Sequence, residues 1–179
     1  MKNIINDSPE IFTIDNFITN EECEHFINIS KNKIQTAYVC GDKKGIVSKG
    51  RTGKNCWISK NSDNITQNVA NKISKLVGVP IEQAESFQVI YYDINQEYRN
   101  HYDSWLFDNS ENSVRNLKNG QRIKTVLVYL NDVIKGGGTK FTKLNIEIKA
   151  EKGKLLMFDN VHKNTNTRHE LSEHAGMPV

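Results

Sequence analysis

Helical patterning in the first part of the chain gives way to strand patterning in the second, and this division constrains the fold most. Apolar residues recur every three or four positions between about 62 and 77, which predicts an amphipathic helix that ends at Gly78 and Pro80. Later segments rich in β-branched, aromatic or aliphatic residues are separated by turn residues: 86–92, 123–130, 146–149 and 155–158. Helices followed by strands are typical of an α+β fold, with the helices packed on one face of a largely antiparallel sheet.

Another helix is expected near the N-terminus, after a short strand at 11–15. Thr19 is a suitable N-cap residue, and Glu22 lies three positions later, where its side chain can reach back to complete a capping box. Apolar residues then follow at helical spacing until Ser30 interrupts the stripe. We therefore expect a helix that packs on the core and frays near Ser30.

The bulk properties of the chain exclude several classes of protein. Its 179 residues suffice for one domain with its own core, and we expect a single domain over 1–179. A net charge of +3 on dispersed basic residues does not favour nucleic-acid binding. No apolar run could span a bilayer, and the N-terminus lacks the apolar core of a secretion signal. Three cysteines without metal-type spacing favour reduced thiols, so we expect a cytoplasmic protein without membrane partners.

The segment 41–55 is rich in residues that favour an irregular backbone. It contains four Gly, four Lys and one Arg, and only two strongly apolar residues, Ile46 and Val47. This composition predicts a mobile surface loop. The loop could be a solvated connection or a lid over an active site.

His101 and Asp103 stand two positions apart after a hydrophobic segment. On an extended backbone, side chains at this spacing point to the same side. A second imidazole from a distant strand would complete two His and one carboxylate, a set that binds one face of Fe(II) and leaves other positions open. His174, which follows a polar loop as a strand start should, is one candidate for this third ligand. His162 and His169 compete with it for this position.

Five motifs follow one another in the order seen in a known family. They are FQVIYYDINQEYRNHYD (87–103), QRIKTVLVYLND (121–132), GGGTKF (136–141), KGKLLMF (152–158) and EHAGMPV (173–179). With the N-terminal IDNFITNEECEHFI, these motifs make the chain similar to the prolyl 4-hydroxylases, which are Fe(II)- and 2-oxoglutarate-dependent dioxygenases. The resemblance covers nearly the whole chain. It implies a double-stranded β-helix, or jelly-roll, core with the N-terminal helices packed on one sheet.

The resemblance also implies a role for individual residues. His101, Asp103 and His174 match the family's iron ligands. Tyr92 and Thr139 match residues that contact 2-oxoglutarate, while Tyr98 and Arg122 match residues that hold the peptide substrate. The segment 41–55 matches a flexible segment that folds over the substrate.

The implied reaction is hydroxylation of prolyl residues in a peptide or protein, with release of succinate and carbon dioxide. It requires Fe(II), with 2-oxoglutarate and O2 as co-substrates, and ascorbate is a further candidate cofactor. Alternatives are a related dioxygenase that acts on another residue or a small molecule, and a non-catalytic jelly-roll binding protein. The sequence does not indicate an oligomeric state.

Two features depart from the family pattern. A basic residue that pairs with the far carboxylate of 2-oxoglutarate is expected about ten positions after the second His, which falls beyond Val179. Either the chain is truncated and a C-terminal strand is missing, or the contact comes from elsewhere, with Lys124 as a candidate. Gly138 also stands where the family commonly has Glu, which removes a charge from this turn.

Overall fold

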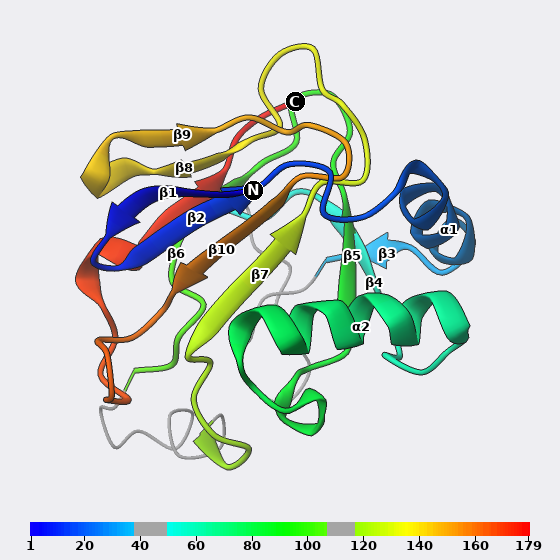
Figure 1. The fold of residues 1–179 in the computed structure, drawn as a ribbon. Helices are drawn as coiled ribbons and strands as arrows, with labels where there is room; N and C mark the ends of the chain where they lie inside the picture. The colour runs from blue at the N-terminus through cyan, green and yellow to red at the C-terminus, as the bar shows by residue number, and fades with distance from the viewer. Residues whose placement is uncertain (38–49, 107–116) are drawn as a thin grey trace.

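The computed structural model describes residues 1–37, 50–106 and 117–179, which form two helices and a largely antiparallel set of strands (Figure 1). The helices are α1 (Asn20–Ser30) and α2 (Asn64–Val77). The strands are β1 (Lys2–Asp7), β2 (Glu10–Ile14), β3 (Gln35–Thr36), β4 (Lys54–Ile58), β5 (Phe87–Tyr91), β6 (Tyr98–His101), β7 (Lys124–Val128), β8 (Thr139–Phe141), β9 (Ile146–Ile148), β10 (Leu155–Asp159) and β11 (His174–Gly176). Short 3₁₀ helices are η1 (Ile81–Gln83), η2 (Thr142–Leu144) and η3 (Glu170–Ser172).

Helix α1 begins and ends where the sequence predicts. The Thr19 Oγ1 accepts a hydrogen bond from the backbone N–H of Glu22 at 3.2 Å, and the Glu22 carboxylate accepts one from the N–H of Thr19 at 2.9 Å. This reciprocal pair is the predicted capping box. The helix ends at Ser30, where the hydroxyl donates to the carbonyl of Ile27. The capping prediction is therefore confirmed.

Helix α2 also follows its sequence signals. Asp63 caps its N-terminus by accepting hydrogen bonds from the N–H groups of Ile65 and Thr66. At its other end Gly78 has a φ of 68°, a left-handed conformation that a residue without a Cβ adopts at little cost. The predicted end of the helix at Gly78 is thus correct.

The strands form three sheets in which every recorded pairing is antiparallel. One sheet has the order β1-β2-β10-β7, a second has the order β6-β11-β8-β9, and a third has the order β3-β4-β5. In the second sheet, β11 lies between β6 and β8 although the three strands are far apart in sequence. This arrangement brings the region around His101 beside His174.

Two apolar clusters join the helices to the strands. Cys23 and Phe26 of α1 pack with Cys56 and Val89 of the β3-β4-β5 sheet. Residues on α2 pack against β2, β10 and β7 around the buried Met157. Figure 1 shows both helices on the same side of the molecule, next to β4 and β5. Strands β6 and β11, which carry His101 and His174, belong to a different sheet from the strands that these clusters join to the helices.

The structure also corrects the sequence analysis in two places. Strand β1 was not expected, and β4 begins at Lys54, inside the segment 41–55 that was predicted to be a loop. Arg51 of the same segment forms a β-bridge with Tyr98. Residues 38–49, on which the lid prediction mainly depends, lie outside the described part of the chain.

Of the helices in the described residues, none is both long enough and apolar enough to cross a bilayer.

Candidate metal centre

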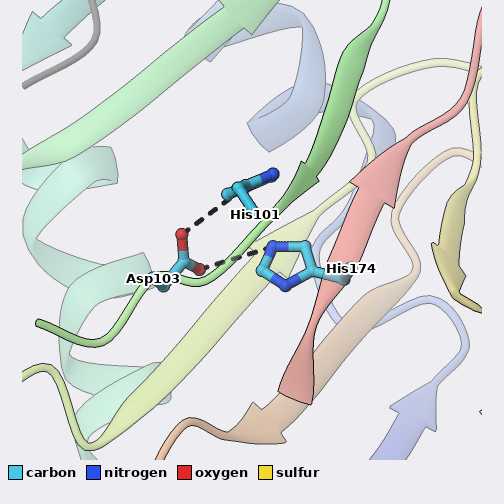
Figure 2. A group of neighbouring side chains, drawn as sticks. All are labelled: His101, Asp103 and His174. Carbon is cyan, nitrogen blue, oxygen red and sulfur yellow. Dashed lines mark ion pairs between the residues drawn. The ribbon is translucent and has the colours of Figure 1, made fainter. Parts of the chain in front are cut away.

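Two neighbouring strands bring His101, Asp103 and His174 to one point (Figure 2). His101 is the last residue of β6 and lies opposite His174, the first residue of β11. One ligand atom from each of the three side chains lies within 4.8 Å of the other two. The Nε2 atoms of His101 and His174 are each 3.6 Å from an oxygen of Asp103, Oδ1 and Oδ2 respectively. The structure therefore brings together the three residues that the sequence analysis had proposed as ligands.

Both imidazoles are oriented by their own backbone. The Nδ1 of His101 lies 2.8 Å from the carbonyl oxygen of Arg99, and the Nδ1 of His174 lies 2.9 Å from that of Ser172. Because a carbonyl can only accept, each Nδ1 carries the proton and donates. In the neutral form of either ring the lone pair is then on Nε2, the atom that faces Asp103. This is the tautomer that a metal-binding histidine requires.

The protonation states of the cluster also suit a cation. Burial, and then the neighbouring His174 imidazole, lower the pKa of His101 to about 4, against the opposing effect of Asp103. Burial alone would raise the pKa of the Asp103 carboxyl. The imidazoles of His174 and His101, with a hydrogen bond from Thr125, instead hold that pKa below its ordinary value. Neutral imidazole and ionised carboxylate are the forms that bind a metal.

The donor set fits Fe(II). Two neutral imidazoles and one carboxylate form the facial set that non-haem iron oxygenases use, and it leaves coordination positions open. The carboxylate is anchored by the Thr125 hydroxyl, which donates to Asp103 Oδ2 at 2.6 Å. The ring of His174, which is buried, packs edge-on against Phe158 with ring centroids 4.6 Å apart. These contacts hold the donors in place in a partly apolar surrounding.

Tyr92 and Thr139, the predicted co-substrate residues, both lie near Gly176 of β11. Thr139 pairs with Gly176 across the strands and is buried. Its Oγ1 accepts a hydrogen bond from the Tyr129 hydroxyl at 2.8 Å. The Tyr92 hydroxyl lies 3.3 Å from the place that a Cβ would take at Gly176. Both side chains are thus two residues along β11 from His174.

Tyr92 keeps its phenolic proton over a wide range of pH. Burial raises its pKa to about 12, although the positive charge of Arg51 opposes this. At neutral pH the phenol can therefore donate a hydrogen bond to a carboxylate. This chemistry agrees with the role that the sequence analysis gave to Tyr92, which remains a prediction.

The two predicted peptide-binding residues lie at different places beside the cluster. The ring of Tyr98 stacks on His101, with centroids 3.5 Å apart. The Arg122 guanidinium lies over the ring of Trp105 at 4.4 Å and forms a two-point ion pair with Glu85. The charge of Arg122 also contributes to the lowered pKa of Asp103, so it is close enough to influence the site.

Arg51 belongs to the site region and was not singled out from the sequence. It is 8% exposed, and its guanidinium lies 4.8 Å from the centre of the Tyr98 ring. It thereby adds a cation–π contact to the stack of Tyr98 on His101. No motif marks this position, and its place within a Gly- and Lys-rich segment made it look like part of a loop.

The alternatives for the third ligand lie elsewhere in the fold. His162 and His169 form a separate group with Glu170, and the His162 Nε2 lies 3.1 Å from the Glu170 carboxylate. The Nδ1 of His169 accepts a hydrogen bond from the N–H of Leu171, so its Nε2 carries the proton and donates to Ser8. Both nitrogens of His169 are then engaged, which disfavours a metal at this second group.

Lys124 does not reach the site from its strand. Thr125 faces Asp103, so its neighbour Lys124 points to the opposite face of β7. There its ammonium pairs with Asp159, its register partner on β10. The structure therefore disfavours Lys124 as a partner for 2-oxoglutarate.

Comparisons with known proteins agree with this geometry. Residues 87–179 match the model of the 2OG-Fe(II) oxygenase superfamily. The chain is 32% identical to probable prolyl 4-hydroxylase 7 of Arabidopsis thaliana over 96% of its own length and 59% of that protein. It is 35% identical to a putative prolyl 4-hydroxylase of Acanthamoeba polyphaga mimivirus, over 94% of this chain and 68% of the viral protein.

A solved structure shares the fold over most of both chains. It is the viral collagen prolyl hydroxylase vCPH from Paramecium Bursaria Chlorella virus-1 in complex with 2OG. The TM-score is 0.71 and the sequence identity is 26%, over 94% of this chain and 88% of that chain. The chain spans 59% of the length of probable prolyl 4-hydroxylase 7 and 47% of the length of probable prolyl 4-hydroxylase 8, both of Arabidopsis thaliana.

Proposed function

The chain belongs to the 2OG-Fe(II) oxygenase superfamily, and from this membership we propose that it hydroxylates prolyl residues in a peptide or protein substrate. The reaction would use Fe(II), 2-oxoglutarate and O2, and would release succinate and carbon dioxide. The observation that carries the proposal is the convergence of His101, Asp103 and His174, with both imidazoles in the metal-binding tautomer.

The chain's own residues would divide the work in the following way. His101, Asp103 and His174 would hold the iron, which with 2-oxoglutarate and O2 supplies the oxidising chemistry. Tyr92 and Thr139 would bind 2-oxoglutarate, because a protonated phenol and a buried hydroxyl both lie near Gly176 of β11.

Tyr98 and Arg122 would orient the peptide. An aromatic ring can pack against a proline ring, and a guanidinium can donate to peptide carbonyls. The stack of Tyr98 on His101 supports this, since it would place a bound proline ring close to the metal. The pairing of Arg122 with Glu85 would hold the guanidinium in one orientation.

We also propose that residues 1–179 form one dioxygenase domain with a double-stranded β-helix core. Support comes from the antiparallel sheets and from the shared fold with the viral hydroxylase. A cytoplasmic location is proposed on one ground: Cys23 and Cys56 are buried free thiols, as expected in a reducing compartment.

The test is a turnover assay with matched peptides. Purified protein with Fe(II) and 2-oxoglutarate should release succinate faster with proline-containing peptides than with the same peptides carrying Ala for Pro, and ascorbate should be varied separately. Mass spectrometry should find one added oxygen on a prolyl residue. His174→Ala should abolish turnover, whereas His162→Ala, in the separate histidine group, should not.

Other outcomes point to the alternatives. Turnover with free amino acids or with peptides lacking proline would indicate a dioxygenase of another specificity. Failure to bind 2-oxoglutarate in the metal-loaded state would favour a non-catalytic binding protein.

A further inference from the structure

Asn160 is a buried polar residue that the proposed reaction does not use. Its exposed fraction is 0%. Its backbone is held on both sides: its N–H donates to the carbonyl of Ile123 at 2.9 Å, and its carbonyl accepts from the N–H of His169 at 2.9 Å. Asn160 is therefore fixed between the start of β7 and the segment that leads to His174, and the direction of its side chain is determined.

The side chain of Asn160 is connected to Asp103 through one hydroxyl. The Asn160 Nδ2 lies 2.8 Å from the Thr125 Oγ1, and the Thr125 Oγ1 lies 2.6 Å from the Asp103 Oδ2. A carboxylate only accepts, so the single hydroxyl proton of Thr125 must go to Asp103. The Thr125 oxygen is then left as an acceptor. Of the two ends of the Asn160 amide, only the NH₂ group can donate a hydrogen bond to it.

The other end of the Asn160 amide has no hydrogen bond within the described part of the chain that would set the orientation instead. Its Oδ1 is buried and has no hydrogen-bond partner among residues 1–37, 50–106 and 117–179. An acceptor buried without a partner costs free energy. Rotating the amide would place an acceptor against Thr125 and break its link to Asp103. The amide orientation is thus set by the donor that Thr125 needs.

We propose that Asn160 is a positioning residue for the metal centre, acting through Thr125 on Asp103. The chain from Asn160 to Thr125 to Asp103 would hold the Asp103 carboxylate in one orientation between the two imidazoles. This inference rests on the proposed function only in that His101, Asp103 and His174 hold a divalent ion. Outer hydrogen bonds of this kind orient ligands, and their loss typically weakens metal binding about 10–100-fold.

The test measures Co²⁺ binding to the full chain by calorimetry and by visible absorption, neither of which requires turnover. Thr125→Val removes the hydroxyl and should weaken Co²⁺ binding about 10-fold or more. Thr125→Ser restores a hydroxyl and should recover most of that loss. Thr13→Val is the control, since Thr13 is a strand threonine on β2 of the same sheet as Thr125, and it should leave Co²⁺ affinity unchanged.

Asn160 is tested by two substitutions of different shape. Asn160→Leu and Asn160→Ala both remove the donor, so both should weaken Co²⁺ binding several-fold and alter its absorption spectrum. In a Thr125→Val background, neither should weaken binding further, because the link to Asp103 is already absent. Such non-additivity is the mark of two residues in one chain of contacts.

Clear results would overturn the inference. Circular dichroism and Tm identify the Asn160 variants that are folded. If these variants bind Co²⁺ like the wild type, Asn160 has no positioning role at the metal centre. Losses that add fully to that of Thr125→Val would mean that Asn160 acts by another route. If the His174→Ala variant bound Co²⁺ as tightly as the wild type, the metal centre itself would be refuted, and the inference with it.

Discussion

The rings of Tyr98 and His101 stack with centroids 3.5 Å apart and planes 17° apart. A residue expected to contact the peptide therefore packs directly on a residue expected to bind the metal. Substrate and metal affinity should be coupled through this pair, because anything that moves one ring must move the other. Arg51 makes a cation–π contact with the same Tyr98 ring.

Removing the Tyr98 ring should loosen His101. Stacked aromatic pairs contribute about 0.5–1.5 kcal/mol beyond burial, so Tyr98→Ala should weaken metal binding roughly 2–10-fold. Tyr98→Phe keeps the stack and should bind metal like the wild type, while its KM for the peptide changes if the hydroxyl contacts substrate. Calorimetric titration with Co²⁺ checks the first statement, and equal losses in both variants would contradict it.

Gly53 should control the position of Tyr92. A Cβ at residue 53 would lie 2.6 Å from the Tyr92 ring, closer than carbon atoms approach without a clash. Gly53→Ala should therefore displace the ring and raise the KM for 2-oxoglutarate several-fold, with a smaller effect on the KM for the peptide. Succinate formation at varied 2-oxoglutarate concentration measures this.

The control for Gly53→Ala is a second substitution at Tyr92, whose ring lies next to residue 53. In a Tyr92→Leu background the ring is gone, so adding Gly53→Ala should raise the KM for 2-oxoglutarate little further. An effect of Gly53→Ala that is unchanged in that background would place its cause outside the Tyr92 ring.

The metal-free protein should lose stability as pH falls below neutrality. The pKa of His101 is lowered to about 4 from an ordinary value of 6.5, so the unfolded chain binds its proton first. The stabilising contribution is complete above pH 6.5 and is lost as pH falls toward 4. Urea unfolding with a chelator present, compared at several pH values, should show this decline.

The matching variant is His101→Phe, which removes the titrating group and keeps an aromatic ring on Tyr98. Its unfolding free energy should fall less over the same interval of pH. A histidine NMR titration of the wild type provides a direct reading: a His101 signal that titrates near 6.5 in the folded protein would contradict the lowered pKa.

The pair of Glu85 and Arg122 should matter more for substrate than for stability. Glu85 is about half exposed, with 52% of its side chain accessible, and exposed ion pairs contribute about 0–1 kcal/mol. Glu85→Gln should thus change Tm little but raise the KM for the peptide several-fold, because Arg122 is no longer held over Trp105. Glu10→Gln breaks an exposed pair with Lys2 and serves as the control. A large loss of Tm with no change in KM would show that the pair is structural.

The sequence predicted those elements whose determinants are local. The capping box at Thr19 and the apolar periodicity ending at Gly78 both act within a few residues, and α1 and α2 follow them closely. Strand β1 has no such signal, because it is an edge strand with mostly exposed residues. Strand β4 starts with polar residues directly after Gly53, so the sequence pattern predicted that the loop continued through them.

The candidate site likewise has residues that the sequence predicted and residues that depend on contacts between distant segments. The spacing of His101 and Asp103, together with a later His174, could be read from the order of residues. Thr125 and Asn160 could not, because the link from Asn160 through Thr125 to Asp103 depends on how β7 lies beside β10. Arg51 escaped notice because its bridge to Tyr98 joins segments that no motif connects.

The two histidines carry their own orientation, since each Nδ1 bonds a carbonyl only two residues earlier. Asp103 takes its orientation from Thr125, on a strand remote in sequence. A slip of β7 by a single position would turn Thr125 outward and offer Asp103 an ammonium group or a methyl surface instead, from Lys124 or Val126. Metal affinity should therefore depend on the alignment of β7 with β10, the same alignment that places Val126 and Val128 against the core.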